Sequence, residues 1–74
     1  MGVRRGIWDI FLPVPLPGLW IEMKVGTGKL TLEQAAWRKS LMPYGYQFYV
    51  AYNWIEAARR LAIWVGMPES EWPK

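Results

Sequence analysis

Two acidic residues and a lysine near the amino terminus have the types and spacing of a hydrolytic metal site. Asp9 precedes Glu22 by thirteen residues, and Lys24 follows Glu22 by two. Side chains alternate along a β-strand, so Glu22 and Lys24 are expected to point to the same face. An antiparallel strand that contains Asp9 would bring a second carboxylate beside them. Two carboxylates and an ammonium group can hold a divalent cation and direct a hydroxide at a phosphodiester.

The segments around these residues predict the two strands that must position them. Residues 7–12 and 19–25 are rich in β-branched and aromatic side chains, which is typical of strands. Between them, residues 13–18 contain three prolines, which deny backbone donors and fix φ. The sequence therefore predicts two strands joined by a stiff connection, followed by a flexible glycine-containing turn at 26–29.

The second half of the chain predicts a helix, a third strand and a last helix. Thr31 and Gln34 match a capping box, and the apolar stripe of this helix is expected to comprise Leu32, Ala35, Ala36, Leu41 and Met42. Residues 46–52 have the composition of a strand, and Asn53 begins a helix that ends at Gly66. We expect an α/β fold with the order ββαβα and a small mixed sheet. Residues 1–74 form one domain in this interpretation, with a flexible tail at 67–74.

Composition narrows the chemistry that is available. The chain has 74 residues, 53% of them hydrophobic, with six tryptophans, no cysteine, no histidine and a net charge of +3. Disulfides, thiolate zinc sites and histidine-dependent nucleophiles are therefore excluded. The longest uncharged run, which contains residues 41–55, is shorter than the roughly 20 residues that span a bilayer. We expect a cytoplasmic protein without membrane contact, and its aromatic surface favours a dimer or larger assembly.

Each candidate residue also has a purely structural interpretation. Glu22 and Lys24 could be solvent-facing side chains on an edge strand. Helix capping alone would explain Gln34. Arg4 and Arg5 could belong to a solvated terminus, and Lys29 to an ordinary charged turn. The aromatic side chains could form a core or could stack bases, although Trp20 shares the strand parity of Glu22.

The order of several separate motifs resembles the VRR-NUC nuclease domain, a member of the PD-(D/E)xK superfamily that also occurs as small stand-alone phage proteins. The resemblance covers residues 3–65. It rests on Val3-Arg4-Arg5-Gly6, Asp9, Trp20-Ile21-Glu22-Met23-Lys24, Gly28-Lys29-Leu30-Thr31, Gln34, Trp37 and Gly45-Tyr46. It implies a minimal restriction-endonuclease-like core.

The resemblance also implies roles for individual residues. Asp9, Glu22 and the backbone carbonyl of Met23 would coordinate Mg²⁺ or Mn²⁺. Lys24 and Gln34 would be the catalytic side chains, with Lys24 orienting the attacking water or stabilising the developing charge. Phosphate contacts would come from Arg4, Arg5 and Lys29.

The chain departs from the family pattern at two points. Trp8 occupies the position where the family usually has proline. Family members usually begin with a helix that bears a further metal-binding glutamate, and the eight residues before Asp9 contain no acid. The expected fold therefore lacks the usual N-terminal helix.

The leading hypothesis is a metal-dependent DNA nuclease that acts as a homodimer on branched or flapped DNA, in the cytoplasm of a phage-infected or bacterial cell. The alternative is a catalytically impaired DNA-binding or subunit-interaction protein that retains the nuclease fold. A tryptophan-rich protein of the membrane surface ranks last, because Arg59 and Arg60 do not make a basic helical face.

Overall fold

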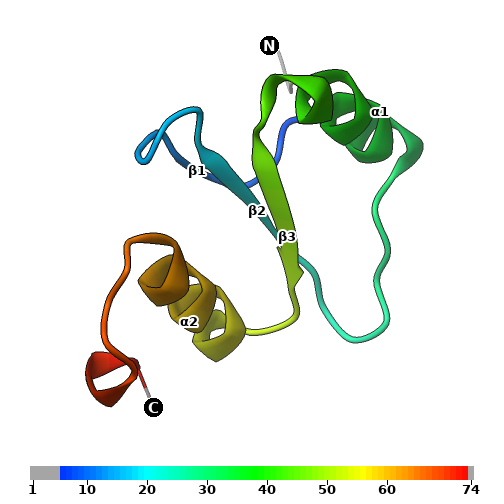
Figure 1. Cartoon of the computed structure of the whole chain (residues 1–74). Helices are drawn as coiled ribbons and strands as arrows, with labels where there is room; N and C mark the ends of the chain where they lie inside the picture. The colour runs from blue at the N-terminus through cyan, green and yellow to red at the C-terminus, as the bar shows by residue number, and fades with distance from the viewer. Residues whose placement is uncertain (1–5, 74) are drawn as a thin grey trace, which may run out of the picture.

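The computed structural model describes residues 6–73 and has the predicted α/β order (Figure 1). Three strands and two helices follow one another along the chain: β1 (Ile10–Leu12), β2 (Leu19–Met23), α1 (Leu32–Leu41), β3 (Gln47–Ala51) and α2 (Trp54–Trp64). Two short 3₁₀ helices, Met42–Tyr44 and Glu69–Glu71, follow α1 and α2. The small α/β fold with a mixed sheet is confirmed.

The described residues form one sheet with the strand order β1-β2-β3, so β2 is its central strand. β1 pairs with β2 in antiparallel register, with Ile10 opposite Ile21. β3 pairs with β2 in parallel register, with Trp20 opposite Phe48. A parallel pair needs a crossover connection, which α1 supplies.

The hydrophobic core lies between the sheet and α2. The side chains of Leu19 and Ile21 are fully buried there, together with Ala51 from β3 and Ala57 from α2. Because side chains alternate along β2, the residues between these core positions point to the opposite face of the sheet. That face carries Glu22, and α1 lies on its side of the sheet (Figure 1).

Aromatic side chains fill much of the α1 side of the sheet. Trp20 stacks on Phe11 from the neighbouring strand, with ring centroids 4.2 Å apart, and meets the edge of Trp37 from α1 at 5.6 Å. Trp8 packs edge-on against Phe48 at 5.0 Å. Trp20 therefore lies beside the candidate site as part of a packed cluster, and Trp37 joins the helix to the sheet.

Two details of the prediction were wrong. The strands are shorter than the predicted segments: residues 24–25, 46 and 52 lie outside them, and residues 7–9 leave β1, with Trp8 buried beneath α1. The predicted apolar stripe of α1 is only partly on the packing face: Ala35 and Leu41 are half-buried, but Leu32 is 89% exposed and no residue of the helix is fully buried. α1 instead contacts the sheet through Gln34 and Trp37.

The C-terminal segment contacts α2 and itself. The indole N–H of Trp72 donates to the carbonyl of Met67, and Arg59 donates to the carbonyl of Pro73. The flexibility expected of residues 67–74 stays a prediction. Among residues 6–73 no helix has the length and apolarity needed to cross a bilayer.

Candidate active site

The ends of β1 and β2 bring Asp9 and Glu22 together. Asp9 directly precedes β1, and continuing the register of Ile10 with Ile21 places it opposite Glu22. The backbone N–H of Asp9 donates to Oε1 of Glu22 at 3.3 Å, and the backbone N–H of Met23 donates to Oδ2 of Asp9 at 2.9 Å. The Asp9 carboxylate thus binds the backbone of β2, and the Glu22 carboxylate binds the backbone directly before β1. The predicted antiparallel pairing is confirmed.

Glu22 is the buried charge of the site. Its side chain is only about 5% exposed, and it lies on the central strand. Oε2 accepts a hydrogen bond of 2.7 Å from Nε2 of Gln34 and lies 3.3 Å from Nζ of Lys24. A buried carboxylate is costly unless it is paired and hydrogen-bonded, and Glu22 satisfies both conditions.

Gln34 joins the helix to the buried ion pair. Its Oε1 accepts from Nζ of Lys24 at 2.8 Å and from the backbone N–H of Thr31 at 3.0 Å, while its own backbone N–H donates to Oγ1 of Thr31. These acceptor contacts, with the donation of Nε2 to Glu22, fix the orientation of the amide. The capping role is confirmed, and the same side chain also contacts Glu22 and Lys24, whereas a role of Gln34 in catalysis stays a prediction.

The interpretation of Glu22 and Lys24 as exposed residues on an edge strand is wrong. β2 has a neighbour on each side, and the Lys24 side chain, which follows the strand, is only 16% exposed. The parallel pairing of β3, which follows the crossover through α1, makes β2 central. Asp9, Glu22, Lys24 and Gln34 are called the Glu22 cluster below.

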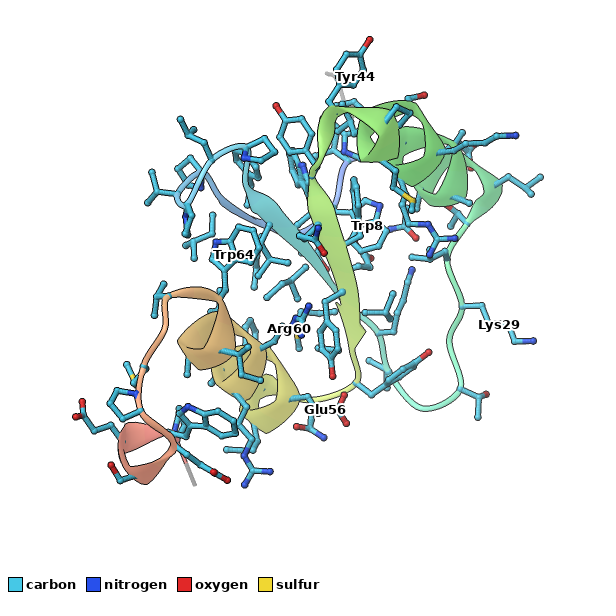
Figure 2. The ribbon with its side chains drawn as sticks, viewed as in Figure 1. Trp8, Lys29, Tyr44, Glu56, Arg60 and Trp64 are labelled. Atoms are coloured by element: carbon cyan, nitrogen blue, oxygen red, sulfur yellow. The ribbon has the colours of Figure 1, made fainter. Side chains whose placement is uncertain are left out.

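Trp8 is a part of the site that sequence reasoning missed. Its buried indole N–H donates to the backbone carbonyl of Gln34 at 3.1 Å, across 26 residues of sequence. This hydrogen bond therefore fixes the first turn of α1, which carries Gln34, next to the cluster. Figure 2 shows Trp8 on the α1 side of β3, opposite Arg60. The only sequence signal was a bulky donor directly before Asp9.

Of the three predicted phosphate-binding residues, Lys29 alone is among residues 6–73, and it lies outside the cluster. Lys29 is exposed on the connection between β2 and α1, and its side chain points away from the cluster (Figure 2). Arg4 and Arg5 lie outside the described residues.

The charges of the three ionisable side chains in the cluster do not cancel. Asp9 and Glu22 carry two negative charges against the single positive charge of Lys24, which leaves one negative charge uncompensated among these three side chains. Within residues 6–73 no group of three acidic, histidine or cysteine side chains is placed to hold a metal ion. Mg²⁺ usually keeps several waters and needs only one or two protein carboxylates.

Replacing Gln34 with alanine is expected to cost about 2–3 kcal/mol of unfolding free energy, because the change removes a hydrogen bond to a buried charge as well as part of the cap. Thr31→Ala removes the cap alone and is expected to cost about 1 kcal/mol. Alanine is the strongest helix former, so helix propensity does not add to either loss. Urea unfolding followed by tryptophan fluorescence measures both, and equal losses would show that Gln34 acts only as a cap.

No protein-family model matches this chain, and neither the curated proteins nor the solved structures contain a significant match to it.

Proposed function

We propose that this protein is a metal-dependent DNA nuclease of the VRR-NUC type, with a minimal restriction-endonuclease-like core. The observation that carries the proposal is the assembly of Asp9, Glu22, Lys24 and Gln34 at the junction of β1, β2 and α1. The resemblance in sequence assigns these four residues to one active site, although they are spread over 26 positions. Their contacts in the fold support that assignment.

The donor set fits one hard divalent cation. Asp9 is exposed; its backbone N–H donates to Glu22, and its carboxylate accepts from the N–H of Met23 at the end of β2. The N–H of Met23 points to Asp9, and in an extended strand the carbonyl of the same residue points to the same edge. Asp9, Glu22 and the Met23 carbonyl would hold Mg²⁺ or Mn²⁺. The bound ion would polarise the scissile phosphate and lower the pKa of a bound water.

Lys24 and Gln34 supply the remaining chemistry from this chain. The Lys24 ammonium is held between Glu22 and Gln34, so its position is fixed before a substrate binds. Such a preorganised cation stabilises the negative charge that develops on a phosphodiester during hydrolysis. Gln34 positions both charged partners through its amide, and Trp8 positions Gln34 through its backbone carbonyl.

The substrate in this proposal is branched or flapped DNA, bound by a homodimer. The net charge of +3 favours a polyanionic partner. Arg4 and Arg5 are proposed phosphate contacts on the strength of the sequence resemblance. Lys29 is proposed as a peripheral contact, since it points away from the cluster.

One observation favours the alternative of a catalytically silent DNA-binding or subunit-interaction protein. Both oxygens of Glu22 already have partners within the chain: the Asp9 N–H on one side, and Gln34 with Lys24 on the other. A network whose hydrogen-bonding groups already have partners within the chain can serve as a structural connection between the sheet and the helix. A measurement of metal binding therefore distinguishes the nuclease from the catalytically silent alternative.

Calorimetric titration with Mn²⁺ provides that separation. The wild-type chain is expected to bind Mn²⁺, and Asp9→Asn to bind at least about tenfold more weakly, since even the loss of an outer partner of a metal site costs that much. Glu71→Gln, in the exposed 3₁₀ helix Glu69–Glu71, is the control and should bind like the wild type.

Cleavage of a labelled flap and of a linear duplex, each with Mg²⁺ and with EDTA, completes the test. The proposal expects metal-dependent cleavage with a preference for the flap. Absence of Mn²⁺ binding together with DNA binding that is indifferent to metal would favour the silent alternative.

A further inference from the structure

β3 ends the sheet on one side and is not paired on its outer edge by any strand of residues 6–73. In Figure 1 it passes in front of β2, and no helix or loop is drawn in front of it. Residues 46–52 contain neither a charged residue nor a proline. Natural proteins usually protect an exposed edge with such residues, because unpaired backbone groups accept a strand from another chain.

The backbone pairing identifies which groups of β3 are open. The N–H of Gln47 donates to the carbonyl of Gly18, and the carbonyl of Ala51 accepts from the N–H of Lys24. Residues 47, 49 and 51 therefore direct their backbone groups to β2. Phe48 and Val50 alternate with them, so their N–H and C=O groups point to the outer edge.

The Glu56 carboxylate occupies the backbone donor that follows the C-terminal end of this edge. The backbone N–H of Tyr52 is the next outward donor, and it donates to Oε1 of Glu56 at 3.0 Å. The same carboxylate accepts from the side chain of Asn53 at the start of α2. The open part of β3 is thus limited to the backbone groups of Phe48 and Val50.

We infer that this edge pairs with β3 of a second copy of the chain, in antiparallel orientation about a two-fold axis at Tyr49. Only this register keeps every paired residue within Gln47–Ala51 and avoids the occupied N–H of Tyr52. Phe48 then faces Val50 of the partner subunit, and the two residues exchange both backbone hydrogen bonds. The two-fold axis repeats the exchange, so all open groups of Phe48 and Val50 are satisfied.

The side chains at the two ends of β3 favour a second copy over an unrelated strand. Tyr44 precedes the strand and is 74% exposed, whereas Tyr52 and Trp54 follow it and are 44% and 69% exposed. Antiparallel pairing places the start of one β3 beside the end of the other. The exposed aromatic residues that flank β3 in one copy would thereby lie near those of the other copy, where their apolar surface could be buried. A chain of 74 residues has a small core, which oligomerisation commonly supplements.

The pairing would give one six-stranded sheet with both Glu22 clusters on the same face. Glu22 is level with Val50 across β2 and β3. From strand and residue spacings, the two Glu22 positions would lie about 15 Å apart. Under the proposed nuclease function, two sites would then face one DNA molecule; this consequence rests on that function, whereas the pairing itself does not.

Sedimentation velocity without metal or DNA tests the pairing independently of nuclease activity. The wild-type chain is expected to sediment as a dimer, with twice the 8.7 kDa of the single chain. Tyr49→Lys places two lysines opposite one another at the two-fold axis, beside Arg60 of each copy, whose guanidinium carbon lies 5.2 Å from the centre of the Tyr49 ring, and this variant alone is expected to be monomeric. Tyr49→Glu, whose carboxylate would lie beside the same guanidinium, is the variant of opposite charge. Mixing the two variants is expected to restore a dimer, which a folding defect could not do.

Val50→Pro and Leu32→Glu complete the design. The N–H of Val50 points outward, so proline removes no intrachain ladder bond but blocks the pairing, and this variant is expected to be a folded monomer by circular dichroism. Leu32→Glu, on the exposed side of α1, is expected to remain dimeric. A monomeric wild type overturns the inference, and so does a dimer that survives Val50→Pro or dissociates only with Leu32→Glu.

Discussion

Replacing Glu22 with glutamine is expected to reduce metal-dependent DNA cleavage by at least about 100-fold. The change keeps the shape of the side chain but removes one of the two carboxylates available to a cation. Metal-assisted stabilisation of a phosphodiester transition state contributes several kcal/mol, and each 1.4 kcal/mol corresponds to about tenfold in rate. Single-turnover cleavage of a flap substrate at saturating Mg²⁺ measures the effect.

Glu56→Gln is the matched control for this experiment. Glu56 is also a glutamate whose carboxylate accepts a backbone N–H, that of Tyr52, but it lies at the start of α2 and outside the cluster. Cleavage by Glu56→Gln is expected to equal that of the wild type when both are assayed as the same oligomer. If Glu22→Gln cuts as fast as this control, the cluster is not the active site.

Replacing Lys24 with methionine is expected to lower the cleavage rate by about 100- to 1,000-fold, the loss caused by removing one preorganised charge-stabilising donor. Mn²⁺ affinity is expected to stay the same or to increase, because a positive charge next to Glu22 disappears. This split between rate and metal binding distinguishes Lys24 from Asp9, whose loss weakens Mn²⁺ binding.

Lys24→Met also carries a stability cost that must be separated from catalysis. The change leaves the buried Glu22 carboxylate without its ion-pair partner, and breaking a buried pair from one side costs about 3–5 kcal/mol. Activity is therefore compared at a temperature where circular dichroism shows that both proteins are folded. Lys39→Met, on the exposed side of α1, is the control. Cleavage by Lys24→Met at the rate of this control would refute a catalytic role for Lys24.

Local signals made the order of elements and both helix starts predictable. Thr31 and Gln34 form the expected capping box, and Asn53 accepts the backbone N–H of Glu56 as the N-cap of α2. Both contacts span three residues, so the chain alone specifies them. The same holds for the shared face of Glu22 and Lys24, since alternation along a strand is a local property.

Features that depend on distant packing were not predictable in the same way. The apolar stripe assigned to α1 is exposed at Leu32, because the crossover from β2 to β3 turns the face with Gln34 and Trp37 to the sheet. Trp8 leaves the strand expected at 7–12 because its ring is buried against Phe48. Neither contact has a signal within one turn or one strand.

The sequence by itself determined which residues could form the cluster, because side-chain alternation, the capping pattern and the absence of histidine and cysteine are properties of the chain. Only the tertiary structure decided that Glu22 lies on a central strand and that Gln34 bridges it to Lys24. The partners of the Glu22 carboxylate include the backbone of Asp9, thirteen residues earlier, and the amide of Gln34, twelve residues later. Their meeting depends on the antiparallel pairing of β1 and on the crossover through α1, and local periodicity specifies neither.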